Sequence, residues 1–508
     1  MFGNIVVREH GNIGLMMRGP IRDPVAGSPI AAGQLADLLG RWSSVPGPLF
    51  RCLATRLQEL TETGELPPGT RLPAERRLAQ ALAVSRNTVA AAYQQLRDAA
   101  VAETRRGAGT MLAPPRPPIA GAHRTNALFA SLLERHPAAV DLTCAAPSCP
   151  PRIAQVLARP ADMLPAPLAA QLCDGIGYHP AGTPLLREAV ADHLSGLGLP
   201  TGPDQILITT GAQQAIDLLA RAYLAAGDAV AAEQVTYPGI LDAITRAGGR
   251  CLSLPLTERG VAIDAVAHAL DVHRPRLVYL IPTFQNPTGR LLGDHDRRAL
   301  VDLADRHPHT TIIDDYVLGE LDHDGPMAPP LAALAPDRGN LVTVGSLSKL
   351  YWGGLRVGWL RAPSGVVRRL AATKAAADLG SNAPGQIVAA HLLRTEHTRL
   401  RRWRNQQLAA ALDTLTGALA RWLSDWQWQR PCGGQTLWVR LPGVDARGFA
   451  QTALRHGVAV VPEPLLSPDP RGGDHLRIPF VAPTDQLIQA VQRLAGAWTT
   501  HLQQHHQP

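Results

Sequence analysis

The sequence predicts an α/β protein with two folded parts. The first is a small helical domain near the N-terminus, and the second is a larger domain built on a mostly parallel sheet with helices on both faces. The chain of 508 residues is too long for one core, since single cores stop growing at about 250 to 300 residues. The segment APPRPP at 113–118 is too rich in proline for a helix or a central strand and therefore marks a linker. Strand-like and helix-like blocks alternate regularly only after this linker.

Composition excludes several classes of protein. Hydrophobic residues make up 45% of the chain and charged residues 18%, which is typical of a folded protein. No apolar run approaches the roughly 20 residues that a membrane span requires, and the first residues lack a signal-peptide pattern, so we expect a cytoplasmic protein. The six cysteines are scattered without a CxxC pair, so we expect neither a metal site nor a disulfide framework.

Three short helices are expected before the linker. Leucines at every third or fourth position of 49–60 share one helical face, and a turn at LPPGTRLP follows, with Pro73 starting the next helix. That second helix directs Leu78 and Leu82 inward. Ser85 is a good N-cap for the third helix.

The segment VAETRRGAGTML at 101–112 predicts two short strands joined by a turn that contains glycine. Three helices and a β-ribbon are the arrangement of a winged helix-turn-helix, whose third helix enters the major groove of DNA. Residues 51–116 hold ten arginines and six acidic residues, so their net charge is 10 − 6 = +4. This is more than half of the chain's net charge of +7. Such a face can neutralise DNA phosphates. Charge alone, however, is more typical of a solvated surface.

The order of residues favours DNA binding. LPPGTRLPAERRLAQALAVSRNTVAAAYQQL followed by RRGAGT resembles the GntR superfamily of bacterial transcription regulators over residues 49–112. In that family the turn before the wing usually holds a glycine, whereas Ala99 and Ala100 occupy it here. The residues that the resemblance assigns to DNA contact or to the wing are Arg76, Ser85, Arg86, Asn87, Thr88, Arg106, Gly107 and Gly109.

After the linker, runs of branched residues alternate with amphipathic stretches, as in QILITTGAQQAIDLLARAYL and NLVTVGSLSKLYWGGLRVGWL. Repeats of strand, short loop and helix indicate a mostly parallel sheet covered on both faces. Ligands of such sheets bind beyond the carboxyl ends of the strands. Polar residues stand where several of these strands end, so we expect them to form one site.

Lysine is rare in this chain, which contains only Lys349 and Lys374 among 49 basic residues. Lys349 lies in GSLSKL, directly after the apolar strand LVTV, and GGLRVG follows it. At this point a lysine can be the counter-charge of a phosphate or the nucleophile of a Schiff base. An isolated lysine is more often solvated, but its position beyond a buried strand favours a functional role for Lys349.

The other loops supply the groups that pyridoxal phosphate (PLP) requires. Asp314, at the end of the strand TTII, can keep the pyridine nitrogen protonated so that the ring acts as an electron sink. Tyr316 and Asn286 can bond the oxygen of the ring hydroxyl group. Tyr237, in TYPG, can stack on the ring face. Each of these motifs is weak by itself, because each also occurs in ordinary turns and cores.

A phosphate site is expected at TTGAQQ, where a strand leads into a helix. Backbone amides at the start of a helix point toward a bound phosphate. The three amides in question belong to Gly211, Ala212 and Gln213. The residues expected to close the phosphate site from the other side are Ser346, Ser348 and Arg356.

The joint order of TGAQQ, YPG, NPTG, DDY, SLSK and GLRVG resembles the fold-type I, class I aminotransferases over residues 141–494. The resemblance implies that Lys349 holds PLP as a Schiff base and that a smaller α+β subdomain lies at the C-terminus. It also implies a homodimer in which Tyr178, in GYHPAG, reaches the phosphate of the neighbouring subunit. Arg477, in HLRIPF, would grip the carboxylate of a substrate or effector, for which a planar guanidinium fork is suited.

A GntR-like domain, a linker and an aminotransferase-like domain in this order resemble the MocR (GabR-like) regulators. We therefore expect a PLP-binding transcription regulator that binds double-stranded DNA and senses PLP or a small amino compound. The expected segments are an N-terminal extension over 1–33, the winged helix over 34–112, the linker over 113–140 and the PLP-binding domain over 141–500.

Two other functions stay open. The set of Lys349, Asp314, Tyr316, Asn286 and Arg477 is also complete for a working aminotransferase that carries a DNA-binding domain. A DNA-binding protein with a relic domain that no longer binds PLP is disfavoured, because a relic has no reason to keep that set. DDYVLGELDHDG departs from the corresponding stretch of GABA-responsive regulators, so the resemblance implies no particular effector.

Overall fold

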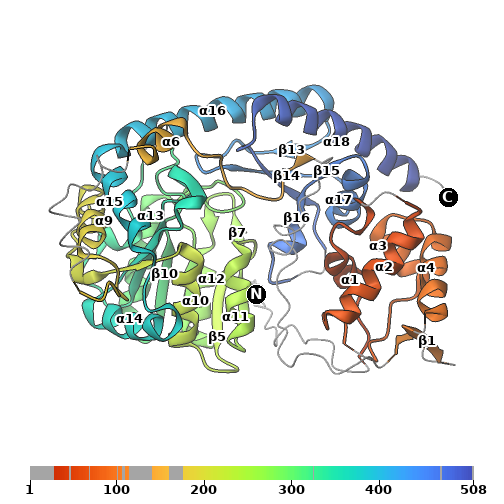
Figure 1. Ribbon diagram of the computed structural model, residues 1–508, viewed down its shortest axis with the longest axis horizontal. Coiled ribbons are helices and arrows are strands. Elements are labelled where there is room, and N and C mark those ends of the chain that lie inside the picture. Colours follow the sequence, from red (N-terminus) through yellow and green to blue (C-terminus); the bar gives the residue numbers. More distant parts are fainter. Residues whose placement is uncertain are drawn as a thin grey trace, which may run out of the picture.

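The computed structural model divides the chain into three parts (Figure 1). An N-terminal helical domain lies beside a C-terminal subdomain, and the large sheet domain lies on the other side of that subdomain (Figure 1). The structure describes residues 28–44, 47–67, 69–99, 101–105, 109–113, 140–159, 175–323, 325, 327–469 and 472–505.

The N-terminal domain is a winged helix-turn-helix, as predicted. Its elements are α1 (Ala32–Leu39), α2 (Leu49–Glu62), α3 (Glu75–Leu82), α4 (Arg86–Asp98) and the antiparallel pair β1 (Ala102–Arg105) and β2 (Gly109–Leu112). The leucines of these helices form a core of their own. Ser85 caps α4 by accepting a hydrogen bond from the amide of Thr88 at 3.1 Å. Pro73 does not start the second helix, because α3 begins two residues later, at Glu75.

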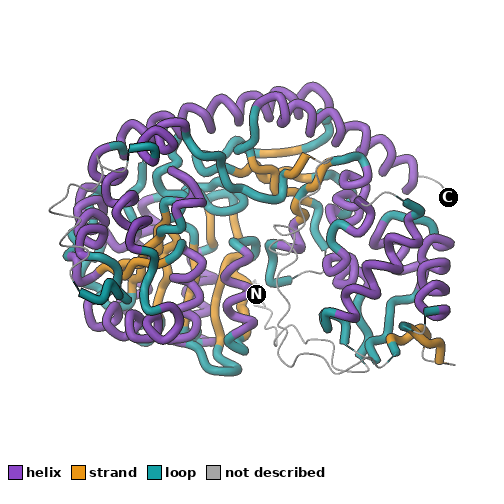
Figure 2. The backbone as a smooth tube through the Cα atoms, viewed as in Figure 1, coloured by secondary structure: helices purple, strands orange, loops and turns teal. Residues whose placement is uncertain are grey.

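The large domain contains a seven-stranded sheet with helices on both faces, which confirms the predicted fold class (Figure 2). All strands are parallel except β12, which is antiparallel to both of its neighbours. Side chains from the two faces enter two separate cores, as Ile312 and Ile313 do from the same strand. In order across the sheet the strands are β4 (Ile206–Thr209), β12 (Gly358–Arg361), β11 (Leu341–Ser346), β10 (Thr311–Asp315), β9 (Leu277–Leu280), β5 (Ala229–Glu233) and β6 (Arg250–Leu254).

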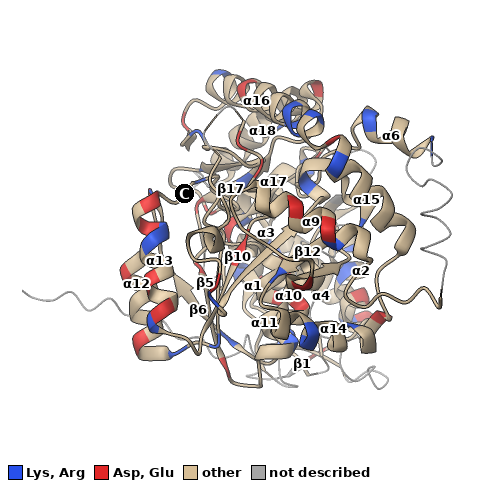
Figure 3. Cartoon of the chain, turned by 90° about the vertical axis from the view of Figure 1, so that its left-hand side faces the viewer, with Lys and Arg blue, Asp and Glu red and all other residues tan. Residues whose placement is uncertain are grey.

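Amphipathic helices cover the sheet, and charged residues of both signs lie mainly on the outer helices (Figure 3). None of the helices that the structure describes is long and apolar enough to cross a membrane. The helices of the large domain include α9 (Pro184–Gly196), α10 (Ala212–Tyr223), α11 (Pro238–Arg246), α12 (Ile263–His268), α13 (Asp294–Arg306), α14 (Ser364–Asp378) and α15 (Ala383–Thr395).

The predicted C-terminal subdomain is present as a four-stranded sheet packed against long helices. β3 (Val140–Asp141), which follows the linker region, pairs in parallel with β15 (Val458–Ala459) and so joins the subdomain. Its other elements are α16 (His397–Trp422), β13 (Gln427–Trp428), β14 (Thr436–Arg440), α17 (Ala446–Arg455), β16 (Val461–Pro462), β17 (His475–Pro479) and α18 (Thr484–His505).

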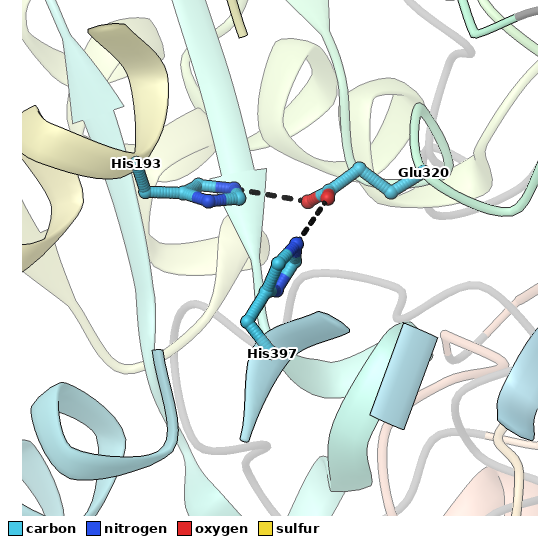
Figure 4. Close-up of side chains that lie close together, drawn as sticks. All are labelled: His193, Glu320 and His397. Atoms are coloured by element: carbon cyan, nitrogen blue, oxygen red, sulfur yellow. Dashed lines mark hydrogen bonds and ion pairs between the residues drawn. The ribbon is translucent and has the colours of Figure 1, made fainter. Parts of the chain in front are cut away.

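Three side chains fasten the large domain to the start of α16 (Figure 4). His193 on α9 lies 3.0 Å from one oxygen of Glu320, and His397 on α16 lies 2.8 Å from the other. Tyr351 contacts the second ring nitrogen of His397 at 2.8 Å. One nitrogen or oxygen atom from each of His193, Glu320 and His397 lies within 4.8 Å of the others, which is close enough to hold a metal ion. The expectation of no metal site therefore stays a prediction. Each group already has a partner here, which makes the cluster a connection between elements distant in sequence.

We expect Glu320→Gln to lower the thermal midpoint of the large domain at pH 7, by the equivalent of about 1 to 3 kcal/mol. Burial acts to raise the pKa of Glu320, but the hydrogen bonds from both histidines hold it well below its ordinary value. A depressed carboxyl pKa stabilises the fold above the unfolded value of about 4.3, and this contribution is lost as the pH falls further. The difference between wild type and variant should therefore shrink below about pH 4, as measured by calorimetry.

Glu188→Gln is the matched control. Glu188 lies on the same α9, but its side chain is 53% exposed and its contact with Arg394 is 3.5 Å long. Exposed ion pairs contribute little to stability. An equal loss of stability in the Glu188 and Glu320 variants would contradict the role of the buried cluster.

Candidate cofactor and effector site

A cavity of about 380 Å³ lies where the parallel strands end. Ile281 follows β9, Asp315 ends β10 and Ser346 ends β11, and all three line the cavity. This volume is typical of a site for a small molecule or cofactor. The predicted site residues that line it are Gly211, Ala212, Gln213, Tyr237, Asn286, Ser346, Ser348, Lys349, Arg356 and Arg477.

The expected phosphate end of the cavity is built at the start of α10. Gly211 has a φ of 119°, which favours glycine, and a Cβ there would lie 3.4 Å from the guanidinium of Arg356. Arg356 donates to the carbonyl oxygen of Thr210 at 2.5 Å and so borders the same helix start. The hydroxyl of Ser346 donates to that of Ser348 at 2.9 Å. A helix start, an arginine and two hydroxyl groups suit a phosphate.

Lys349 lies in the short helical turn that follows β11. Its Nζ donates to the carbonyl oxygen of Ala145 at 3.0 Å, and burial lowers the pKa of this amine. A lowered pKa increases the neutral fraction, which is the nucleophilic form. The lysine is thus suited to covalent attachment of an aldehyde such as that of PLP.

Asp315, not Asp314, faces the cavity. Successive residues of a strand point to opposite faces, and the structure places Asp315 in the cavity wall, where its carboxylate accepts from the hydroxyl of Tyr279 and from the amide of Val317. Asp314 instead accepts from the amide of Leu331 at 2.6 Å, and burial raises its pKa to about 6. The prediction that Asp314 contacts the pyridine nitrogen is therefore wrong. Asp315 is the carboxylate that can.

Tyr316 is also displaced from its predicted place. It follows β10 directly and does not line the cavity, and its hydroxyl donates to the carbonyl oxygen of Ala328 at 2.8 Å. Val317 and Leu318 line the cavity beside Asp315. Tyr316 therefore cannot reach the oxygen of a ring hydroxyl group from where it lies, whereas Asn286 can.

The cavity fits PLP because it presents polar atoms that need partners. Burying such atoms without partners costs about 1 to 3 kcal/mol each, which a polar ligand would offset. The cavity-lining atoms without a hydrogen-bond partner among the described residues are Oε1 of Gln213, Oδ1 of Asn286, Oε1 of Gln435 and Nε of Arg477. When bound, PLP would supply the electron sink that amino-group chemistry requires.

Arg477 projects from β17 into the cavity and is fully enclosed. Its Nη2 donates to the carbonyl oxygen of Thr143 at 2.5 Å, while its Nε has no partner among the described residues. Burial lowers the pKa of this guanidinium to about 10, so it stays charged at neutral pH. A buried cation with an unused donor is suited to a ligand carboxylate.

Tyr178 lies outside the cavity, and its side chain is 58% exposed. On the N-terminal domain the first turn of α4 is also open, because Ser85, Arg86 and Asn87 are exposed and Thr88 is half-buried. Arg76 on α3 is exposed near this turn. Two predicted DNA contacts, Arg106 and Gly107, lie outside the described residues.

Two groups of contacts have no sequence signal that we recognised. Gln435 and Thr436 line the cavity at the start of β14, and residues 143–146 line it beside Lys349, which bonds the carbonyl oxygen of Ala145. Asp315 had a signal, because strand alternation places it opposite Asp314, but using that signal requires knowing that β10 extends to residue 315.

The fold and the cavity define a fold-type I, PLP-dependent aminotransferase domain joined to a winged helix-turn-helix. The family model for aminotransferase class I and II matches residues 169–494, and that for the bacterial regulatory proteins of the gntR family matches residues 51–112. The solved structure of LysN, the α-aminoadipate aminotransferase of Thermus thermophilus, is similar with a TM-score of 0.65 and 28% identity. The similarity covers 74% of this chain and 95% of LysN, which was crystallised with N-(5'-phosphopyridoxyl)-L-leucine.

Two of the similar curated proteins are named as regulators. The HTH-type transcriptional regulator YisV of Bacillus subtilis (strain 168) is 30% identical over 77% of this chain and 84% of its own length. The probable rhizopine catabolism regulatory protein MocR of Rhizobium meliloti is 29% identical over 62% of this chain and 66% of its own length. The chain belongs to the aminotransferase class I and II family, and with its gntR-family domain it is a PLP-binding regulator of the MocR type.

The two aspartates of β10 provide a matched pair of variants. We expect Asp315→Asn to weaken PLP binding about 10-fold or more, because a neutral amide cannot form a charge-assisted bond with the protonated ring nitrogen. Asp314→Asn should change PLP affinity less than twofold and act mainly on thermal stability, since its side chain accepts from the backbone of Leu331. Spectrophotometric titration with PLP measures both, and the opposite ranking would refute the assignment of Asp315.

Proposed function

We propose that the large cavity binds PLP together with an amino acid effector, and that the first turn of α4 contacts the operator. The observation that carries this proposal is the enclosure of Lys349, Asp315, Arg356 and Arg477 in one cavity. Lys349 supplies an amine and Asp315 a carboxylate, while Arg356 suits a phosphate and Arg477 suits the carboxylate of a ligand. The phosphopyridoxyl-leucine bound to LysN carries a ring, a phosphate and a carboxylate, which would be the partners of Asp315, Arg356 and Arg477 in that order.

In this proposal Lys349 holds the cofactor, Asp315 keeps the ring nitrogen protonated, and Tyr237 and Asn286 contact the ring. The amides at the start of α10 bind the phosphate with Ser346, Ser348 and Arg356. Arg477 orients the effector by its carboxylate. A ligand that lacks a carboxylate should therefore bind much more weakly than the matching amino acid.

DNA recognition is proposed for the exposed first turn of α4. Arg86 forms an ion pair with Glu75 at 2.9 Å, yet its side chain is still 59% exposed. Because exposed ion pairs are weak, a DNA phosphate or base edge can replace Glu75 at little cost. Arg76, Ser85, Asn87 and Thr88 are further proposed DNA contacts, and the family resemblance adds Arg106 and Gly107, which lie outside the described residues.

We expect Arg86→Ala to weaken specific operator binding by about 1 to 3 kcal/mol, or roughly 5- to 150-fold, without changing PLP binding. Fluorescence anisotropy with a labelled operator duplex measures the loss. Arg97→Ala is the control, because Arg97 lies in the last turn of the same helix and bonds only Gln94 among the partners described. An equal loss in both variants would mean that general charge, and not the start of α4, determines binding.

A homodimer is proposed on the family resemblance and on the exposure of Tyr178 together with Ile176, which is 83% exposed. Large apolar side chains exposed side by side are typical of an interface between protein chains. In the proposed dimer Tyr178 reaches the phosphate of the neighbouring subunit.

A working aminotransferase is the second candidate function. Lys349, Asp315 and Arg477 line one cavity, and these groups suffice for amino-group transfer with PLP. This candidate differs from the first in what happens after the ligand binds.

Two assays on the PLP-loaded full-length protein separate the candidates. The first measures turnover with amino acids and 2-oxo acids, and the second measures retention of the gene's own upstream DNA with and without PLP. We expect DNA retention that depends on PLP and little turnover. Sustained turnover without DNA retention at low salt would establish the enzyme and contradict the regulator.

A further inference from the structure

The segment 141–146 contacts two of the cationic groups that line the cavity, Lys349 and Arg477. The carbonyl oxygen of Thr143 accepts from Arg477 at 2.5 Å, and that of Ala145 accepts from Lys349 at 3.0 Å. The side chain of Gln435 also donates to the carbonyl oxygen of Ala145. The two groups proposed to hold an effector carboxylate and PLP are therefore both bonded to one short stretch of backbone.

The same segment is attached to the DNA-binding domain through its side chains. Arg41, two residues after α1, donates from Nη2 to the carboxylate of Asp141 at 2.8 Å and to the hydroxyl of Thr143 at 3.0 Å. Its side chain is only 7% exposed. The carboxylate of Asp141 also accepts from the amide and the hydroxyl of Thr143, at 2.9 and 2.6 Å. Buried, charge-assisted bonds of this kind fix geometry as well as contributing stability.

Thr143 is the one described residue that lines both the large cavity and a smaller cavity of about 70 Å³ between the domains. The smaller cavity is bordered by Asp37 and Arg41 of the N-terminal domain and by Arg447 of α17. The backbone of Thr143 thus faces the proposed effector, while its side chain faces the DNA-binding domain.

The geometry of Arg477 makes this contact sensitive to a ligand. A carboxylate that binds side-on takes the parallel N–H groups of Nε and Nη2. In the structure Nε has no partner among the described residues, whereas Nη2 is bonded to the carbonyl oxygen of Thr143. Nη2 carries two N–H groups, so a carboxylate bound in this way shares this nitrogen with the carbonyl oxygen of Thr143 and repels that oxygen.

We propose that Thr143 couples the cavity to the DNA-binding domain: a ligand carboxylate on Arg477 shares Nη2 with the Thr143 carbonyl and repels it, and the resulting shift of segment 141–146 alters the bonds that hold Arg41. This inference rests on the proposed function, which it deepens by naming the residues of the regulatory connection. Ligand and DNA then affect each other's binding through Thr143 and Arg41.

A second interdomain contact offers a matched comparison. Asp37 on α1 accepts two bonds from Arg447 on α17, at 2.7 and 2.8 Å. This pair joins the same two domains as the Arg41 contacts, and neither residue lines the large cavity. Both residues border the smaller cavity, but their bonds are separate from those that join Arg41 to Asp141 and Thr143, so weakening the pair disturbs the interface and leaves those bonds in place.

The experiment uses the full-length protein and two probes that differ in the carboxylate. Pyridoxamine 5'-phosphate supplies ring and phosphate alone, and N-(5'-phosphopyridoxyl)-L-alanine adds a carboxylate. Operator affinity is measured by anisotropy with each probe at saturation, on a duplex that the protein itself selects from a random library. The ratio of the two dissociation constants is the carboxylate-dependent coupling, and calorimetry gives the affinity of each probe in the absence of DNA.

We expect the ratio in the wild type to differ from one by about 5- to 150-fold. Thr143→Val, which keeps the backbone carbonyl and the branched shape, should bring the ratio several-fold closer to one. Arg41→Met, whose position is outside the large cavity, should bring the ratio close to one while probe affinity without DNA changes less than about threefold. Asp37→Asn should keep the wild-type ratio, even if operator affinity falls equally with both probes.

Several results would overturn the inference. A wild-type ratio of one with both probes and the operator bound would reject it, while leaving the regulator itself in place. Wild-type ratios in both Thr143→Val and Arg41→Met would reject the assigned residues, as would loss of coupling in Asp37→Asn alone. Failure of the wild type to bind either probe or any duplex would instead reject the proposed function. If the melting curve shows that Thr143→Val does not fold, the ratio measured for Arg41→Met tests the inference by itself.

Discussion

The convergence of parallel strands at one edge of the sheet is the constraint on which the site depends. β9, β10 and β11 end side by side, and Asp315, Ser346 and Lys349 lie at or just beyond those ends. Side chains more than 30 residues apart in sequence are thereby held in one enclosure by the sheet itself. The same geometry gives Lys349 its low pKa, because a residue at the end of a buried strand is enclosed by protein on most sides.

A second constraint follows from burying two cations in that enclosure. Neither Lys349 nor Arg477 forms an ion pair with a carboxylate among the contacts described, and each is instead solvated by a backbone carbonyl of segment 141–146. Carbonyl oxygens are weaker partners than carboxylates, so an anionic ligand can replace them at modest cost. Because this segment leaves the linker region and joins the subdomain through β3, the ligand site and the route to the DNA-binding domain are built from the same residues.

Much of this could be read from the sequence, and the failures have clear physical causes. Local signals were sufficient for the winged helix, where the N-cap at Ser85 and the leucine pattern specify the helices. Motif order was sufficient to gather most cavity residues. The error at Asp314 arose from strand parity: neighbouring residues point to opposite faces, so a shift of one position exchanges the cavity for the core. Contacts such as Arg41 with Thr143 join residues about 100 positions apart and leave no local pattern.

The presence of a complete set of PLP-binding groups does not by itself decide between enzyme and regulator. In the proposed site both would hold the cofactor on Lys349 and orient an amino acid on Arg477, so both need the same groups up to the point of binding. They differ in the use of the binding free energy, because an enzyme applies it to the transition state and a regulator to a shift between domain arrangements. A ligand shifts such an equilibrium only if it binds the two arrangements differently. A carboxylate site whose arginine is also bonded to the interdomain segment meets that condition, since a ligand there shares Nη2 of Arg477 with the Thr143 carbonyl and so acts on a residue that Arg41 contacts.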